Sequence, residues 1–352
     1  MYPNGCKPKM PPIIVIFGDK STQLGERDNV KLSILTPHYT EGIEVIRPLL
    51  ESLKIQQDFD FNDLEVIICH DGTEARDFLF KKTESPFEIR QIRLSKNNLC
   101  RARNYLLDAS VGDYVMFCDC DDMFFNVAAL WLINEKIKKG FDILIPKFIE
   151  EVKNRDTGEM ICFAHEYETT FIHGKVYRKA FLTEKNIRWD EELWAHEDFY
   201  FNVLAQSLCE DTKYCQTPYY MWRWRDSSAC RRDPKFLLKT YRNLIDANDH
   251  LIDEFLRRES KDNAEVYVTL AVFDAYYTMN KLEWIYQQNK EYREETEKRF
   301  SEYFKKFKDI WDGVTDENKM VVSSKVRERN VREGMSMETI SIGEWLKHIE
   351  QM

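Results

Sequence analysis

Three carboxylates gather within four residues in the segment Asp119-Cys120-Asp121-Asp122. They directly follow the apolar run 114–118, which predicts a buried strand. Carboxylates this close repel one another and raise one another's pKa unless a cation offsets them. Clustered oxygen ligands suit a hard divalent ion such as Mg²⁺ or Mn²⁺, which can bridge two phosphates. The alternative is that Asp121 or Asp122 caps the helix expected near 126–137, since aspartate is a favoured N-cap residue.

Alternating strand and helix patterns surround this cluster. Buried strands are predicted at 31–36, 64–69, 88–94 and 114–118. Helices are predicted between them at 43–53, 74–82 and 100–109. Such alternation implies βαβ crossovers and a mainly parallel sheet flanked by helices, an α/β fold. Ligands of these sheets bind beyond the carboxyl ends of the strands, so we expect the chemistry in the loops that begin at Pro37, His70 and Asp119.

The pattern changes towards both ends of the chain. Residues 1–29 read as an N-terminal extension whose short apolar run could add a strand to the main sheet. Beyond Pro234, long amphipathic patterns predict helices, and 290–308 reads as a solvated helix with one aromatic stripe. We therefore predict an extension over 1–29, an α/β catalytic domain over 30–232 and a helical accessory domain over 233–352.

Composition and charge limit the classes of function. Hydrophobic residues make up 43% and charged residues 32% of the 352, so the chain should fold. The net charge of −10 argues against nonspecific binding to nucleic acid, although basic residues gather at 223–235. The apolar stretch at 13–17 is too short for a signal peptide or a membrane span. Nine cysteines at irregular spacing predict buried free thiols and hence a cytoplasmic protein.

Four short motifs follow one another in register with the predicted strands. They are Thr36-Pro37-His38-Tyr39, then Val66 to Thr73, then the run from Ala102-Arg103-Asn104 through Gly112-Asp113-Tyr114 to the acidic cluster, and last Glu197-Asp198. In this order they resemble the family 2 glycosyltransferases of the GT-A fold, over roughly residues 31–230. The resemblance implies a Rossmann-like GT-A domain that moves a sugar from a nucleoside diphosphate donor to an acceptor.

Residues at the ends of the first two strands could select the nucleotide base. Tyr39 offers an aromatic face for stacking, a role that the resemblance also implies. Asp71 can accept a hydrogen bond from a ring imino N–H, which uracil, thymine and guanine carry and cytosine lacks. A UDP-sugar donor is therefore favoured. The family often has two adjacent acids here, whereas this chain has His70 before Asp71, and we expect His70 to be a loop histidine without a role.

The acidic cluster matches the family's DxD motif. The resemblance implies that Asp119 and Asp121 hold Mn²⁺ or Mg²⁺ on the diphosphate. Asp122 is then expected to contact sugar hydroxyls or cap a helix rather than bind the metal, and Cys120 to point into the sheet. The resemblance also places Arg103 near the donor, where a guanidinium suits phosphate oxygens. An ordinary surface ion pair is the alternative for Arg103.

Tryptophans and arginines alternate in the segment 222–228. Arg223, Arg225 and Ser228 fit an R-x-R-x-x-S pattern, which the resemblance implies faces the diphosphate. Clustered guanidinium groups could neutralise the leaving group. Trp222 and Trp224 offer faces on which sugars or bases stack, so both are candidates for the acceptor side.

Glu197 and Asp198 fall in the first turn of a predicted helix, where carboxylates are electrostatically favoured. Capping alone would explain them. The resemblance implies that Asp198 is the general base that takes the proton from the attacking hydroxyl, with inversion at the anomeric carbon. We expect His196 to be neither a metal ligand nor a base. Lys175 lies in a stretch that the family uses at the acceptor side, and a strand-edge lysine is an equally good account.

These observations predict a metal-dependent glycosyltransferase, of the hexosyl or pentosyl kind, that acts on a hydroxyl of a glycan, a lipid-linked sugar, a protein or a small molecule. One alternative is glycosylation of a modified nucleic-acid base, which the basic aromatic segment keeps open. A non-catalytic sugar-nucleotide-binding protein is disfavoured because the metal ligands and the base are all present. Nucleotidyl transfer is disfavoured because Pro37-His38-Tyr39-Thr40 is not a glycine-rich loop.

Overall fold

The computed structural model describes most of the chain. The described residues are 14–16, 31–39, 42–71, 85–94, 98–154, 156–228, 236–281, 290–332 and 341–352. They belong to two compact units, of which the first comprises Met1–Trp194 and Phe201–Asp226 and the second Ala195–Tyr200 and Ser227–Met352. The division into three segments drawn from the sequence stays a prediction. The helix predicted at 74–82 lies outside the described residues.

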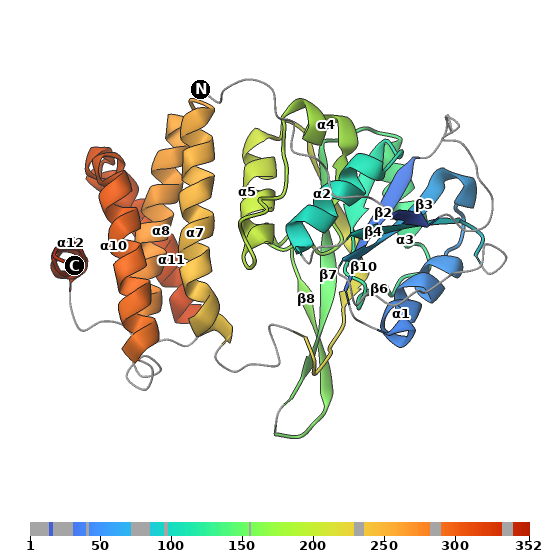
Figure 1. The fold of residues 1–352 in the computed structure, drawn as a ribbon, viewed down its shortest axis with the longest axis horizontal. Helices are drawn as coiled ribbons and strands as arrows, with labels where there is room; N and C mark the ends of the chain where they lie inside the picture. The colour runs from blue at the N-terminus through green and yellow to red at the C-terminus, as the bar shows by residue number, and fades with distance from the viewer. Residues whose placement is uncertain are drawn as a thin grey trace. The chain divides into compact units, whose positions relative to one another are not determined.

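The first unit is built on one sheet, in which the described residues form ten strands (Figure 1). The strand order is β1-β4-β3-β2-β5-β9-β7-β10-β6, with β8 paired to β7. The strands are β1 Ile14–Ile16, β2 Leu32–His38, β3 Leu64–Asp71, β4 Glu88–Leu94, β5 Tyr114–Phe117, β6 Met123–Phe124, β7 Ile143–Lys153, β8 Met160–His165, β9 Val176–Arg178 and β10 Thr212–Trp222. The helices of the first unit are α1 Ile43–Lys54, the 3₁₀ helix η1 Phe61–Asp63, α2 Leu99–Ala109, α3 Ala129–Ile137, α4 Lys179–Glu184 and α5 Glu197–Leu208, whose first turn belongs to the second unit.

The sheet is mixed, and most of its paired residues lie in parallel pairs, so the predicted mainly parallel sheet is confirmed. Strands β4, β3, β2 and β5 pair in parallel, as the βα alternation predicts, and β10 pairs with β7 in parallel. The other described pairs are antiparallel. The N-terminal apolar run does add a strand, because β1 pairs with β4. The carboxyl ends of β3, β2 and β5 lie side by side, so residues that follow these strands meet at one edge.

Helices cover both faces of the parallel part of the sheet. Leu32 and Ile34 of β2 pack in one buried cluster with Leu49 and Leu53 of α1. On the α2 side a buried carboxylate, Glu65, accepts hydrogen bonds from the Ser33 hydroxyl, the Val111 N–H and the Arg90 guanidinium. Arg90 also donates to the carbonyl of Ala109, the last residue of α2, so this network fixes that end of the helix.

Gly112 shows how closely the chain passes the sheet at this point. Its N–H donates to the Ser33 hydroxyl at 2.9 Å. A Cβ atom at position 112 would lie 2.6 Å from that oxygen and 2.8 Å from the Ser33 nitrogen. Only glycine therefore allows this approach without a shift of the backbone, which explains the residue in the Gly112-Asp113-Tyr114 motif.

The second unit is helical. Its helices are α7 Phe236–Arg257, α8 Lys261–Lys281, α10 Lys290–Gly313, α11 Asp316–Arg332 and α12 Ile342–Glu350. The aromatic stripe predicted for 290–308 is confirmed, because Phe300, Tyr303, Phe304 and Phe307 of α10 are buried. The Phe300 ring stacks on Trp345 of α12 at 5.2 Å. The apolar stripe of α10 thus forms part of the unit's own core.

The described cysteines are free, as the sequence predicts, and five of the seven are buried. Cys162 of β8 is exposed. No helix in the described part of the chain combines the length and the apolar character that a membrane crossing requires. The cytoplasmic location stays a prediction.

Candidate active site

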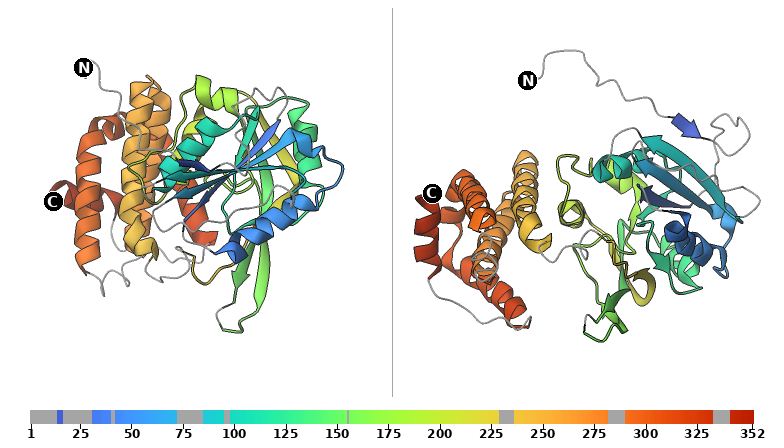
Figure 2. Two further views of the ribbon diagram at one scale, coloured as in Figure 1. Left: turned by 45° about the vertical axis from the view of Figure 1, so that its right-hand side comes forward. Right: turned by 60° about the horizontal axis from the view of Figure 1, so that its bottom comes forward.

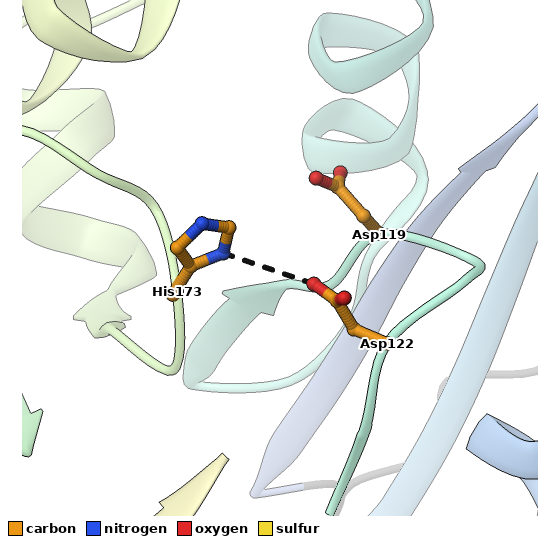
Figure 3. A group of neighbouring side chains, drawn as sticks. All are labelled: Asp119, Asp122 and His173. Carbon is orange, nitrogen blue, oxygen red and sulfur yellow. Dashed lines mark ion pairs between the residues drawn. The ribbon is translucent and has the colours of Figure 1, made fainter. Parts of the chain in front are cut away.

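Asp119, Asp122 and His173 converge at the carboxyl edge of the sheet (Figure 3). The two aspartates flank a turn after β5, in which the Asp122 N–H donates to the Asp119 carbonyl. His173 comes from the segment before β9. One ligand atom from each of the three side chains lies within 4.8 Å of the others, and the Asp122 Oδ2 to His173 Nδ1 distance is 3.7 Å. Two carboxylate oxygens and one imidazole nitrogen could together hold a divalent cation.

Asp122 is fully buried and held in place from two sides. The Tyr220 hydroxyl donates to Oδ2 at 2.5 Å, and the Arg223 N–H donates to Oδ1 at 3.1 Å. Burial, together with the charges of Asp121 and Asp119, raises the pKa of Asp122 well above its ordinary value. The helix-cap interpretation of this residue is wrong for the nearest helix, because α3 begins after Ala128 and has no side-chain cap.

His173 is a neutral imidazole in an aromatic surround. Its ring stacks with Trp222 at 4.7 Å and lies 5.0 Å from Phe148. Burial lowers the pKa of His173 to about 3. Its Nδ1 is buried without a hydrogen-bond partner. A neutral ring with an unused lone pair is the form in which histidine binds metals.

The sequence did not single out His173. Gly174, the next residue, has a φ of +70°, and a Cβ atom there would lie 2.9 Å from the side chain of Pro146. Glycine therefore lets the chain turn sharply before β9 and direct the histidine inward. A histidine before a glycine and a strand is a weak local signal, because its distance from the acidic cluster along the chain has no characteristic value.

Asp121 lies outside this group of three. Its Oδ2 forms an ion pair with Arg225 Nε at 3.0 Å, and its carbonyl accepts a hydrogen bond from the Arg223 guanidinium. Two of the arginines predicted to face the diphosphate thus lie beside the acidic cluster. The structure brings Asp122, rather than Asp121, within ligand distance of Asp119 and His173. The role of Asp121 as a metal ligand stays a prediction.

Arg103 connects α2 to the acidic cluster. Its Nη2 donates to Asp119 Oδ1 at 3.0 Å, and its guanidinium lies 4.3 Å from the centre of the Trp189 ring. Only 2% of the residue is exposed, so the surface ion pair considered from the sequence is wrong. Trp189, which the sequence did not suggest, stabilises the guanidinium through a cation–π contact. Cys120 is buried in the core, as predicted.

Asp71 is the last residue of β3, and only one of its two carboxylate oxygens accepts a hydrogen bond. The Asn98 N–H donates to Oδ2 at 2.7 Å, while Oδ1 is buried and has no hydrogen-bond partner. Burial raises the pKa of Asp71, and the Asn98 bond and the Arg101 charge partly oppose that rise. Tyr39 directly follows β2, the adjacent strand, and is 39% exposed. Both residues lie where a nucleotide base was expected to bind.

His70 is not a loop residue, contrary to our expectation. It lies within β3, is buried, and its Nδ1 is 3.2 Å from Nδ1 of His38 on β2. Its Nε2 is 2.9 Å from Oε1 of Gln91 on β4. An amide oxygen only accepts, so a neutral His70 that donates from Nε2 to Gln91 accepts at Nδ1 from His38. The three side chains thus link the three neighbouring strands β2, β3 and β4.

Lys175 is not a strand-edge lysine. Strand β9, which it precedes, lies between β5 and β7 inside the sheet. Lys175 is 1% exposed, and its ammonium donates to the Phe171 carbonyl. Trp222 and Trp224 are half-buried. The acceptor-side roles of Lys175, Trp222 and Trp224 stay predictions. Ser228 belongs to the second unit, and its role at the diphosphate stays a prediction too.

Glu197 and Asp198 begin α5, as predicted. The Phe199 N–H donates to Asp198 Oδ1 at 2.8 Å. His196 precedes them with a φ of +60°, and burial lowers its pKa to about 4. These residues fall in the stretch that belongs to the second unit. The proposed general base therefore stays a prediction.

Comparison with known proteins agrees with this architecture. Two curated relatives are similar to the chain. The uncharacterized glycosyltransferase EpsJ of Bacillus subtilis is 27% identical over 218 residues, which cover 56% of this chain and 62% of EpsJ. The poly(ribitol-phosphate) β-N-acetylglucosaminyltransferase TarS of Staphylococcus aureus is 27% identical over 189 residues, which cover 50% of this chain and 32% of TarS. The chain thus spans less than two thirds of either relative.

The fold and the family follow from two further matches. The crystal structure of S. aureus TarS 1–349 in complex with UDP superposes with a TM-score of 0.57 at 18% identity, covering 89% of this chain and 94% of that one. The sequence model of glycosyl transferase family 2 matches residues 33–208, which is half of the chain. The protein therefore belongs to glycosyltransferase family 2 and has the GT-A fold.

Proposed function

We propose that this glycosyltransferase transfers a sugar from a UDP-sugar to an acceptor hydroxyl and needs a divalent cation to do so. The observation that carries the proposal is the convergence of Asp119, Asp122 and His173 at the carboxyl edge of the sheet. A uridine donor is supported by the unused Oδ1 of Asp71, an acceptor of suitable chemistry for the imino N–H of uracil. The UDP complex of TarS supports the same donor class.

The three side chains fit a cation. Burial and the charges of Asp121 and Asp119 raise the pKa of Asp122, and His173 Nδ1, which has no hydrogen-bond partner, adds a nitrogen ligand. A mixed set of carboxylate and imidazole ligands suits Mn²⁺ better than Mg²⁺, which prefers oxygen alone. When bound, the ion would neutralise charge on the departing diphosphate.

The chain's own residues would hold the donor around that centre. Arg103 fixes the orientation of Asp119 through their ion pair, and Arg225 lies beside Asp121. We assign Arg223 and Arg225 to the diphosphate, where guanidinium groups offset the charge that develops on the leaving group. Tyr39 would stack on the base and Asp71 would select it.

We assign the proton transfer to Asp198, with Glu197 as its neighbour in the first turn of α5. A carboxylate that takes the proton from the attacking hydroxyl fits a single displacement with inversion. The sugar is open, but the name of TarS records an N-acetylglucosaminyl transfer, so UDP-N-acetylglucosamine is the first donor to test.

The test is release of UDP from a panel of UDP-sugars, with matched GDP- and dTDP-sugars as controls, in the presence of Mn²⁺ or EDTA. We expect release from a UDP-sugar alone, and only with the metal. Asp122→Asn keeps the shape of the side chain and should lower release about 10²–10³-fold. Release that continues unchanged in EDTA would contradict the metal requirement.

A second variant separates binding from chemistry. Asp198→Asn should abolish turnover, while calorimetry shows UDP and Mn²⁺ bound nearly as tightly as by the unmodified protein. Asp122→Asn should weaken both. If donor affinity collapsed in Asp198→Asn, the residue would belong to the donor site rather than to proton transfer.

A further inference from the structure

Strands β7 and β8 form a long hairpin whose tip reaches beyond the other strands of the first unit (Figures 1 and 2). We call its outer part, residues 148–153 of β7 and 160–165 of β8, the arm. The register pairs Phe148 with His165 and Lys153 with Met160. Strand β10 runs along the inner part of β7. None of the roles assigned so far uses the arm.

One face of the arm is aromatic. Phe148 pairs with both His165 and Tyr220, so these three side chains lie on the same side of the sheet. The next row on that side follows two residues along each strand and consists of Glu150, Phe163 and Trp222. We call this surface the aromatic face; Met160 and Cys162 lie on the opposite side.

Ring contacts join the aromatic face to the proposed metal site. His173 lies 5.0 Å from Phe148 and 4.7 Å from Trp222, measured between ring centres. The Phe148 ring in turn stacks on His165 at 4.5 Å with an angle of 5° between the planes. Ring contacts thus join the histidine at the acidic cluster to Phe148 and His165, the innermost pair of the arm.

Beyond Phe148 and His165, the aromatic face is open to solvent. Phe163 is 51% exposed and Ile161, two residues along on the same face, is 40% exposed. His165 Nε2 and Glu150 Oε2 are 2.8 Å apart and form the polar pair beside Phe163. Neighbouring exposed apolar side chains on one face of a hairpin can form a binding surface. An aromatic ring next to such a pair can contact the apolar face of a ligand while the pair exchanges hydrogen bonds with it.

The charge of the aromatic face indicates the kind of ligand. Among the described strand residues on this face, Glu150 is the acid, and neither lysine nor arginine occurs. Lys147 and Lys153 alternate onto the opposite side. A polyanion would lack cationic partners here and would meet a carboxylate. A sugar ring instead presents C–H groups to an aromatic face and hydroxyls to Glu150 and His165.

We propose that the aromatic face of the arm binds the acceptor, and that the acceptor is a neutral carbohydrate chain laid along the arm with one end at the acidic cluster. The inference rests on the proposed function, in that it names the acceptor of that reaction. It assigns Phe163 as the outer stacking residue and the Glu150–His165 pair as its hydrogen-bonding partner.

Two variants on one strand test the proposal. Phe163→Ala removes the ring, while Met160→Ala removes a side chain of almost equal exposure, 49%, from the opposite face of β8. Cello-, xylo- and chito-oligosaccharides serve as neutral probes, and poly(ribitol phosphate) serves as the anionic one. Binding is measured by calorimetry and by saturation-transfer NMR, first without UDP and then with UDP and Mn²⁺.

We expect at least one neutral oligosaccharide to bind the unmodified protein. Its affinity should fall about 10-fold in Phe163→Ala, a loss of one aromatic stacking contact, and should be unchanged in Met160→Ala. Phe163→Tyr, which keeps an aromatic ring at this position, should bind the oligosaccharide as the unmodified protein does. Glu150→Gln should weaken binding less than loss of the ring does.

Three results would overturn the proposal: binding of the anionic polymer alone, equal loss in Phe163→Ala and Met160→Ala, or no binding of any neutral probe. UDP affinity is measured on the same samples and should not differ between the variants. If UDP failed to bind the unmodified protein, that result would contradict the proposed function. The measurement without UDP would still decide whether the arm binds an oligosaccharide.

Discussion

The carboxyl-terminal halves of β2, β3 and β4 and the arm belong to one sheet, but they differ in which side chains they bury. In the first region, His38, His70 and Gln91 are buried and joined by hydrogen bonds. On the arm, Phe163 and Ile161 are exposed. We call the first region the donor edge. The donor edge buries polar groups, and the arm exposes apolar ones.

The difference has an energetic consequence. A buried polar group destabilises the fold unless every partner is in place, so the donor edge has a single well-defined arrangement. Such rigidity suits a ligand that does not vary, such as a nucleotide. An exposed ring contributes little to folding, so the arm can change without loss of the fold. Variants of the donor edge should affect stability or donor affinity, and variants of the arm should affect both much less.

Asp71→Asn should give the largest effect. The amide can still accept from the Asn98 N–H, but its NH₂ group would then face the base in place of Oδ1. Two donors would oppose each other, and we expect the KM for the UDP-sugar to rise about 100-fold. Steady-state kinetics on donor hydrolysis measures it. Phe163→Ala on the arm is the control and should leave this KM unchanged; an equal rise in both would remove the distinction between the two regions.

His70→Leu should give the next largest effect. The change leaves His38 and Gln91 without their partner in a buried site, so the free energy of unfolding should fall by about 2 kcal/mol. The matched control is His165→Leu on the arm, where a half-exposed pair with Glu150 is lost and the fall should stay below about 1 kcal/mol. Chemical denaturation of both variants measures the difference. Equal losses would show that the donor edge is no more sensitive than the arm.

Asp142→Asn should give the smallest effect, and one that depends on pH. Asp142 precedes β7 and accepts hydrogen bonds from Arg178 and from the N–H groups of Glu210 and Asp211. Burial would raise the pKa of Asp142, but these partners outweigh it and hold the pKa below its ordinary value. A lowered pKa stabilises the fold above the unfolded value of about 3.9, and this stabilisation is lost as the pH falls through the folded value.

At neutral pH, Asp142→Asn should therefore lower the free energy of unfolding by about 1 kcal/mol. The difference in the free energy of unfolding between the variant and the unmodified protein should become smaller as the pH drops below about 3.9. Thermal melts over a pH series measure this difference. A stability difference that stays constant with pH would mean that the charge of Asp142 does not stabilise the start of β7.

The parallel half of the sheet could be predicted from the sequence, because its strands are unbroken apolar runs. β4, Glu88–Leu94, has the predicted bounds, and the run at 13–17 supplies β1. The antiparallel half gave no comparable signal. β9 has three residues, and β8 is exposed along most of its length, so neither shows the continuous apolar pattern of a buried strand.

The site was predictable where it depends on neighbouring residues and not where it depends on tertiary contacts. The acidic cluster and Asp71 follow directly from strand ends. The choice between Asp121 and Asp122 depends on the turn after β5, which the spacing of the motif does not reveal. His173 reaches the cluster because β9 inserts between β5 and β7. Burial of Arg103 likewise depends on Trp189, which is remote in sequence.

Pulsed EPR of bound Mn²⁺ tests the central claim most directly, because the spectrum reports which nuclei lie next to the ion. With UDP present, we predict a ¹⁴N coupling from one imidazole and ³¹P couplings from the diphosphate. The nitrogen coupling should disappear in His173→Gln and persist in His165→Gln. Mn²⁺ that shows neither nitrogen nor phosphorus coupling, or a nitrogen coupling that survives in His173→Gln, would contradict the assignment of Asp119, Asp122 and His173 as the site that holds the donor's diphosphate.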